Sequence, residues 1–214
     1  VTAKLAGIAY ILAVALGVVV GVVAAVNHGK WVDSVLMTIS VFGISAPAFW
    51  IAIILQIVIC LKFNLLPLSG IDSFKSFILP GIALGTRYAA SIARITRTSM
   101  LDVLSQDYIR TAEAKGLKGW VVTIKHALRN ALIPIITIAG SDLGNILTGS
   151  VLVESVFSIP GIGKMLVDSI NTRDLPIVQG GVMYIAVICV IMYLVVDLLY
   201  TVVDPRIRLG KESS

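Results

Sequence analysis

The chain alternates long apolar runs with shorter polar segments, which is the pattern of a protein that crosses a membrane several times. A helix needs about 20 apolar residues to span the hydrocarbon core of a bilayer, and only helices or closed barrels can cross it. Five apolar runs reach or approach this length: residues 5–26, 34–61, 77–93, 131–153 and 175–196, the last of which extends to about residue 203. We therefore predict an all-α, polytopic membrane helix bundle with five transmembrane helices, folded as a single domain over residues 1–214.

Two features within these runs predict local structure. Pro47 interrupts the second run, so this span should be tilted or kinked. Gly17 and Gly21 form a GxxxG pair in the first run. This spacing suits close contact between helices, although glycine is also tolerated where a helix faces lipid.

The composition agrees with a membrane location. Apolar residues make up 57% of the chain and charged residues 14%, against about a quarter charged in soluble domains, and the mean hydropathy is +0.98. Lys and Arg are enriched in cytoplasmic segments, so their distribution predicts orientation. One side of the predicted topology carries Lys30, Arg94, Arg97, Arg110, Lys115, Lys118, Lys125, Arg129, Arg206, Arg208 and Lys211, and the other carries Lys4, Lys62, Lys75, Lys164 and Arg173. We predict that residue 1 lies outside and Ser214 inside, and we attribute the net charge of +5 to topology rather than to a nucleic-acid partner.

The polar segment at residues 106–134 is predicted to form two short amphipathic helices that meet at a glycine. One helical face upstream is formed by residues spaced four apart, namely Met100, Leu104, Tyr108 and Ala112. Ser99 and Asp102 could form a capping box for that helix, and Lys115 followed by Gly116 is the usual pair at a helix end. The spacing of four recurs downstream in Trp120, Ile124 and Leu128, and basic side chains occupy another face at Lys118, Lys125 and Arg129. On these grounds alone, the segment is equally consistent with a solvated connector.

The same segment resembles the EAA loop of ATP-binding-cassette importer permeases, the cytoplasmic signature that docks on the ATPase subunit. The similarity is closer to the dipeptide, oligopeptide and nickel permease subfamily, whose run YIRTAxAKG is present at residues 108–116 and whose run HALRNALIP is present at residues 126–134. It continues through VESVFSIPGIGKM at 153–165, RDLPIVQG at 173–180 and VDLLYTVVDPRIRL at 196–209, so it covers most of the chain. The acidic position of the wider signature is Arg110 here, and Glu113 lies three residues later, so the role of the superfamily's Glu is transferred to neither residue.

The resemblance implies a permease subunit of an ATP-driven importer in the bacterial or archaeal cytoplasmic (inner) membrane. Dipeptides, oligopeptides or nickel complexes would be delivered by an external binding protein, and the partners would be nucleotide-binding ATPase subunits and a second, homologous permease subunit. ATP and Mg would be bound by the ATPase subunits, with no cofactor on this chain. The coupling loop would cover residues 98–130, with ATPase-coupling residues at Tyr108, Arg110, Thr111, Ala112, Glu113, Ala114, Lys115 and Gly116. The resembling permeases carry one more N-terminal helix, so we expect this chain to be the family core without it.

A second polar stretch, at residues 154–177, is predicted to lie outside the cell. Ile162, Met165, Leu166 and Ile170 follow helical spacing, which predicts an amphipathic helix. This helix is consistent with an interfacial helix on a surface loop. The resemblance instead favours a role in an external gate, with residues Glu154, Pro160, Gly161 and Gly163.

Ionisable groups within the apolar runs are costly unless they face protein or water. Asp142 lies in the fourth run, where Ser141, Asn145 and Thr148 extend a polar stripe along the helix. We predict that Arg87, Asp142 and Asn145 line a translocation pathway or a subunit contact, although Arg87 could also snorkel. Asp197 is expected to anchor its helix or to form an ion pair near the cytoplasmic side.

The motifs of several other functions are absent from the sequence. There is no GxxxxGK[ST] phosphate loop, no HExxH or other zinc-ligand spacing, and no CxxC pair between Cys60 and Cys189. Both histidines lie in segments predicted to be cytoplasmic, out of reach of a nucleophile in a span. We therefore expect a protein that is not itself an enzyme and binds no metal. The alternative is an ion-coupled secondary transporter that uses Asp142 and Arg87, although such carriers often contain repeated halves and no repeat is visible here.

Overall fold

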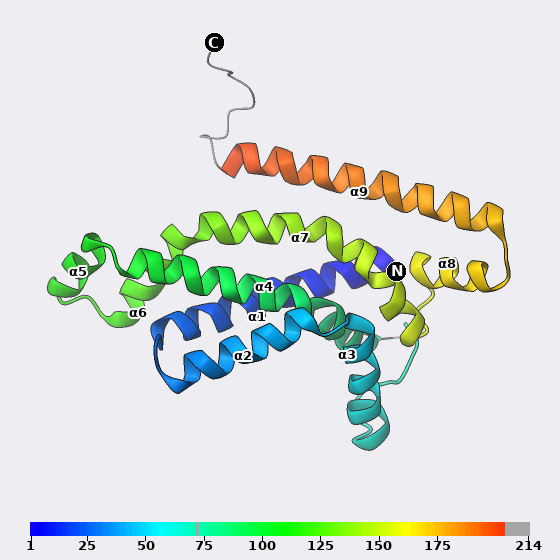
Figure 1. Ribbon diagram of the computed structural model, residues 1–214, viewed down its shortest axis with the longest axis horizontal. Helices are drawn as coiled ribbons and strands as arrows, with labels where there is room; N and C mark the ends of the chain where they lie inside the picture. The colour runs from blue at the N-terminus through cyan, green and yellow to red at the C-terminus, as the bar shows by residue number, and fades with distance from the viewer. Residues whose placement is uncertain (72, 204–214) are drawn as a thin grey trace, which may run out of the picture.

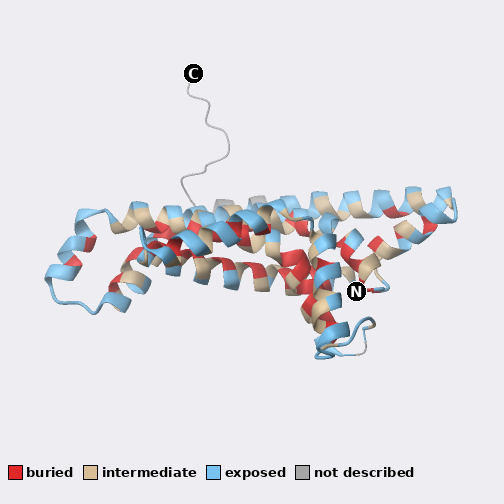
Figure 2. Ribbon diagram, turned by 60° about the horizontal axis from the view of Figure 1, so that its bottom comes forward, coloured by how far each residue is buried: buried red, intermediate tan, exposed pale blue. Residues whose placement is uncertain are grey.

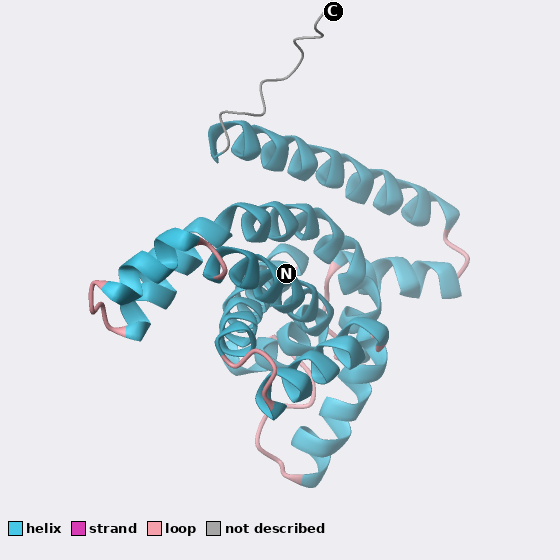
Figure 3. Cartoon of the chain, turned by 60° about the vertical axis from the view of Figure 1, so that its left-hand side comes forward, coloured by secondary structure: helices cyan, strands magenta, loops and turns pink. Residues whose placement is uncertain are grey.

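The computed structural model describes residues 1–71 and 73–203, and every regular element within them is helical (Figure 1). The elements in chain order are α1 (Thr2–Val26), α2 (Trp31–Ser45), α3 (Ala48–Leu55), the π-helical η1 (Gln56–Lys62), the 3₁₀ turn η2 (Phe74–Phe77), α4 (Ile78–Leu104), α5 (Asp107–Ala114), α6 (Gly119–Val121), the π-helical η3 (Val122–Leu128), α7 (Arg129–Val156), α8 (Ile162–Asn171) and α9 (Leu175–Val203). The connections between them are mostly short loops (Figure 3). The predicted all-α class is confirmed.

The centre of the bundle is the contact between α1 and α4, which run parallel and side by side. Gly17 and Gly21 of α1 face α4, so that a Cβ at Gly17 would lie 2.7 Å from the carbonyl oxygen of Ala89 and 2.8 Å from the Cβ of Ile92. Such distances leave no room for a side chain, and the two backbones approach closely as in small-residue helix contacts. The GxxxG pair therefore serves helix packing rather than lipid exposure.

The second apolar run is broken more sharply than the prediction of a tilt or kink implied. α2 and the helix made of α3 and η1 meet at an angle of 108°. The residue before a proline is restricted to extended conformations, and Ala46 indeed has ψ of 129°. Consequently α2 ends at Ser45, and Pro47 starts a helix in a new direction.

Most of the predicted spans are helices that are long and apolar enough to cross a membrane. Residues 2–26, 119–156 and 175–196 form helices long and apolar enough to cross a bilayer, and the bent pair at 31–62 would be a fourth span. The remaining predicted span lies in α4, which carries several charges but is shielded by α1, α2 and α7. Buried residues concentrate along α1, α4 and α7, whereas α9 is exposed over most of its surface (Figure 2).

The elements predicted to lie on opposite sides of the membrane occupy opposite ends of the bundle (Figure 1). One end carries the α1–α2 turn, the end of α4, and α5 with α6. The other end carries the N-terminus, α3, α8 and the start of α9. The predicted order of spans and loops is therefore reproduced in space.

Candidate functional site

The elbow of the predicted coupling loop is a helix end closed by a left-handed glycine. Gly116 has a φ of +77°. Its N–H donates to the Glu113 carbonyl at 2.9 Å, and the Leu117 N–H donates to the Ala112 carbonyl at 3.4 Å. This pair of bonds is the Schellman motif, which satisfies the last carbonyls of a helix. The helix stop predicted at Lys115 and Gly116 is confirmed.

The start of this helix differs from the prediction. α4 continues to Leu104 and two residues separate it from α5, so the apolar face predicted over residues 100–112 belongs to two helices. The proposed capping box is wrong, because Ser99 and Asp102 lie inside α4. The apolar positions at Met100 and Leu104 continue the packing of α4 and do not open a new helix.

α5 is attached to the bundle by its inner face. Ile109 is 1% exposed and Ala112 is 8% exposed, and both belong to a cluster with Met100, Val122 and Ala127. Ala112 therefore faces the chain's own core and offers no side chain to a partner. Its small size lets α5 lie close to η3.

The outer face of α5 is available for contact. The predicted coupling residues on the exposed surface are Tyr108, Arg110, Thr111, Glu113, Ala114, Lys115 and Gly116. Tyr108 Oη accepts a hydrogen bond from Asn130 Nδ2 at 3.1 Å, which links α5 to the start of α7. Arg110 and Asp107 form a fully solvated pair at 3.8 Å, which adds little stability.

The second helix of the elbow continues without a break into α7. Val122 and Ala127 face the core, whereas Trp120 is 68% exposed and Ile124 is also exposed. The predicted face through residues 120, 124 and 128 is thus mainly an outer face. Together with the outer face of α5, it gives the elbow an exposed surface of apolar and charged groups.

A polar cluster beside this end of the bundle was not recognised in the sequence. Asp33 of α2 is buried and accepts hydrogen bonds from Arg97 Nε at 2.6 Å and Arg97 Nη2 at 2.7 Å. The Gly29 N–H donates to the same carboxylate at 3.2 Å, and His28 Nδ1 lies 3.2 Å from it. The bidentate pair fixes the α1–α2 turn to α4. One signal for this cluster is present in the sequence. Asp33 stands at the start of the second apolar run, and arginines follow the end of the third run.

The three predicted pathway residues line one cavity. A hollow of about 490 Å³ between α4 and α7 is bounded by Ile44, Arg87, Tyr88, Ser91, Asp142, Asn145, Thr148 and Gly149. Three members of the polar stripe predicted along α7, Asp142, Asn145 and Thr148, face this hollow together with Arg87 of α4, whereas Ser141 is not among its lining residues. The sequence could not indicate that Arg87 and Asp142, far apart in the chain, share it.

Two neutral polar side chains in the cavity wall form hydrogen bonds. Asn145 Oδ1 accepts from Tyr193 Oη at 2.9 Å, and Thr148 Oγ1 donates to the Asn145 carbonyl at 2.9 Å. Asp142 Oδ2 is buried and has no hydrogen-bond partner in the described part of the chain. Asp197, the other acidic group expected near this helix, lies outside the described side chains.

At the opposite end, Glu154 holds the start of α8. Its side chain is fully buried, and Oε2 accepts from the N–H groups of Gly163 at 2.8 Å and Lys164 at 3.2 Å, while Oε1 accepts from Ser150 Oγ at 3.1 Å. Thr2 Oγ1 accepts from the Ile162 N–H at 2.9 Å. The first N–H groups of α8 are therefore satisfied by other elements, with a carboxylate at the positive end of the helix dipole.

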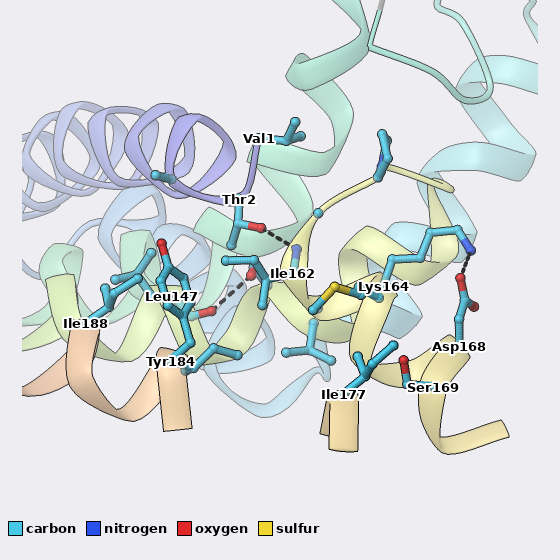
Figure 4. A pocket seen from close by; sticks show the side chains of 18 of the residues that line it. Val1, Thr2, Leu147, Ile162, Lys164, Asp168, Ser169, Ile177, Tyr184 and Ile188 are labelled. Atoms are coloured by element: carbon cyan, nitrogen blue, oxygen red, sulfur yellow. Dashed lines mark hydrogen bonds and ion pairs between the residues drawn. The ribbon is translucent and has the colours of Figure 1, made fainter. Parts of the chain in front are cut away.

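The other predicted gate residues surround this cap. A Cβ on Gly163 would lie 2.5 Å from Val151 Cα, and one on Gly161 would lie 2.6 Å from Thr2 Oγ1. Pro160, Gly161 and Gly163 line a largely apolar hollow of about 740 Å³ between α7, α8 and α9 (Figure 4). The four predicted residues thus lie close together. Pro160, Gly161 and Gly163 line the hollow, and the buried Glu154 is not among its lining residues. The amphipathic helix predicted in this loop is confirmed as α8.

No group of three or more metal-ligating side chains is found among the residues that the structure describes. The candidate functional features are the elbow, the polar cavity and the α8 cap.

Comparison with known proteins connects these features to a family. The family described as "Binding-protein-dependent transport system inner membrane component" matches residues 17–209. The glutathione transport system permease protein GsiC of Escherichia coli (strain K12) is 45% identical over 196 residues, which are 92% of this chain and 64% of that protein. GsiC of Salmonella typhi is 45% identical over 198 residues, covering 92% and 65%. The matched part of the chain therefore spans slightly less than two thirds of the length of these relatives.

Two solved structures share the fold. The MetNI methionine ABC transporter in inward-facing conformations matches with a TM-score of 0.75 and 15% identity, over 95% of this chain and 93% of that one. An amino acid ABC transporter with histidines matches with a TM-score of 0.66 and 18% identity, over 96% and 90%. At these identities, the likeness concerns the arrangement of helices alone.

Proposed function

The chain belongs to the family of binding-protein-dependent transport system inner membrane components, and we propose that it is the permease subunit of an ATP-driven importer of small peptides. It is a multi-pass inner-membrane protein. The observation that carries the proposal is the family match over residues 17–209. In this proposal, ATP is hydrolysed by separate nucleotide-binding subunits, and an external binding protein delivers the cargo to this chain and a second permease subunit.

The elbow supports the coupling part of the proposal. An importer must transmit ATP-driven closure of soluble subunits to its membrane helices. A short helix attached at both ends to long helices can transmit such a motion, whereas a flexible loop cannot. α5 has this form: it follows α4, is closed by Gly116, and leads through α6 and η3 into α7. Its outer face, including Arg110, Glu113 and Lys115, would contact the ATPase subunit.

Small peptides are the proposed cargo because the related GsiC proteins are named for glutathione transport. Glutathione is a tripeptide with free amino and carboxylate groups. The polar cavity at Arg87 and Asp142 would lie on the pathway, and the α8 cap would belong to the external gate. An ion-coupled carrier would also account for the charges of Arg87 and Asp142 in the bundle, but it would not explain the elbow.

Transport in reconstituted vesicles tests the proposal. The full-length chain is purified with its second permease subunit and ATPase subunits, placed in proteoliposomes, and supplied with the binding protein. We expect uptake of radiolabelled glutathione or Ala-Ala to require ATP and the binding protein, and to persist when proton and sodium gradients are dissipated. Uptake driven by an ion gradient without ATP would support the carrier instead. Uptake of nickel complexes without peptide uptake would refute the proposed cargo.

A further inference from the structure

Two opposite charges face the cavity between α4 and α7 without forming an ion pair. Arg87 and Asp142 both line it. The ion pairs formed by the described residues involve other groups, so the distance between the Arg87 nitrogens and the Asp142 oxygens exceeds the 4.0 Å of an ion pair. Asp142 Oδ2 has no hydrogen-bond partner among those residues. An unpaired carboxylate is unfavourable inside a membrane bundle, so a group from outside the described chain should complete this site.

Two neutral polar side chains of the wall already form hydrogen bonds. Asn145 bonds to Tyr193 through Oδ1 and to the Ser141 carbonyl through Nδ2 at 3.4 Å, and Thr148 donates to its own helix. The cavity therefore presents a cation on α4 and an anion on α7, beside two neutral side chains that are already hydrogen-bonded. A wall of this kind favours a ligand with one charge of each sign over a neutral or singly charged one.

We propose that this cavity is a binding subsite for a zwitterionic di- or tripeptide, with its ammonium group on Asp142 and its carboxylate on Arg87. The proposal rests on the proposed function, since it concerns how an importer of small peptides would hold its cargo within the membrane. Arginine presents two parallel N–H donors to a carboxylate, and the three N–H donors of an ammonium suit the Asp142 carboxylate. Both charged groups of the ligand would then have a partner of opposite charge, which lipid and apolar side chains cannot provide.

The dimensions agree with this ligand class. The volume of about 490 Å³ lies within the range of small-molecule sites. An extended chain advances roughly 3.5 Å per residue, so the terminal charges of a short peptide are several ångströms apart. Such a ligand can contact both Arg87 and Asp142 although these two do not contact each other. Ile44 and the ring of Tyr88 would provide an apolar surface for its side chains.

Equilibrium binding to the purified complex of full-length permease and ATPase subunits tests the subsite, with the binding protein omitted so that its own selectivity does not contribute. The complex includes the second permease subunit, and the probes are radiolabelled Ala-Ala, N-acetyl-Ala-Ala and Ala-Ala amide. Binding of Ala-Ala should weaken about 10- to 100-fold when either terminus is blocked, the range for a lost hydrogen bond to a charged group. Asp142→Asn should abolish the difference between free and acetylated peptide, and Arg87→Gln the difference between free and amidated peptide. Arg94→Gln removes a cation from α4 that does not line the cavity, and should behave as the unaltered protein.

Each outcome decides the matter. The crossed pattern of lost discrimination supports the subsite, because a merely structural role would affect all three probes alike. Equal weakening for all probes, or no binding of Ala-Ala by the unaltered complex, would overturn it. Loss of the second permease subunit on Asp142→Asn would also overturn it and would show that the partner subunit covers the carboxylate. In each of these cases, ATP-dependent import of glutathione or Ala-Ala by the complete system would leave the proposed function standing, whereas absence of import would refute that function itself.

Discussion

Replacing Gly116 with valine should disrupt the elbow through its backbone alone. A Cβ added at Gly116 meets no atom of the described residues within 4 Å, so crowding by them does not contribute. The φ of +77° is the source of the cost. An L-residue in the left-handed region costs about 1–2 kcal/mol, and a β-branched residue lies at the upper end of about 1–3 kcal/mol.

This free-energy cost shifts the equilibrium between the closed turn at Gly116 and frayed forms of the helix end. Each 1.4 kcal/mol is a factor of ten in an equilibrium, so Gly116→Val should lower the ratio of the closed Schellman turn to frayed forms by about 5- to 140-fold. In frayed forms the carbonyls of Ala112 and Glu113 bond to water. Gly116→Asn should recover most of the loss, because asparagine tolerates the left-handed conformation.

Gly119 supplies the matched control. A Cβ there also meets nothing within 4 Å, but its φ is not positive. Gly116→Val should therefore speed amide hydrogen exchange in α5 and reduce copurification of the ATPase subunits, while Gly119→Val changes both much less. Equal behaviour of the two variants in both assays would refute the strain argument and leave the segment as a plain connector.

Three further predictions concern the packing of the bundle, each measured by thermal unfolding of the purified protein in detergent. Glu154→Ala leaves the N–H groups of Gly163 and Lys164 without an acceptor and should destabilise the protein by about 3–5 kcal/mol, with faster amide exchange at the start of α8. Glu154→Gln keeps an acceptor oxygen and should cost less than about 2 kcal/mol; equal effects would contradict the cap. Asp33→Asn should cost about 2–3 kcal/mol and the exposed Asp102→Asn close to nothing, and the reverse order would count against the Asp33–Arg97 pair. Gly21→Val should cost roughly 3 kcal/mol through overlap with Thr96 and Ala93, against a small effect for Gly7→Val, which meets nothing; a tolerated Gly21→Val would refute the close helix contact.

Local signals in the sequence predicted much of this structure correctly. The apolar runs indicated where the long helices lie, and the Lys115–Gly116 pair indicated the helix stop, because both depend on short stretches of chain. Pro47 predicted a tilted or kinked span but not a break with an angle of 108°, since that angle depends on what the following helix packs against. The expected helix start near Ser99 was wrong because a spacing of four shows that residues can share a helical face. It does not show where one helix ends and the next begins.

Contacts between distant residues could not be predicted in this way. The Asp33–Arg97 pair joins residues 64 positions apart, and the sequence alone offered several other arginines as partners. The polar stripe of α7 was visible in the sequence, but its position opposite Arg87 follows from the packing of α4 on α7. Glu154 was expected near the external gate from resemblance, and its hydrogen bonds to the α8 backbone became evident only in the structure.

The most direct test of the account is the accessibility of α5, because the proposed function requires this helix to lie in the cytoplasm and to contact the ATPase subunit. Thr111 is exposed on the outer face of α5, and Thr111→Cys can be labelled by a membrane-impermeant thiol reagent after Cys60 and Cys189 are replaced by alanine. The account predicts no labelling in intact cells, rapid labelling in inverted vesicles stripped of ATPase subunits, and protection when these subunits are added back. Labelling from outside intact cells, or labelling that added ATPase subunits leave unchanged, would contradict it.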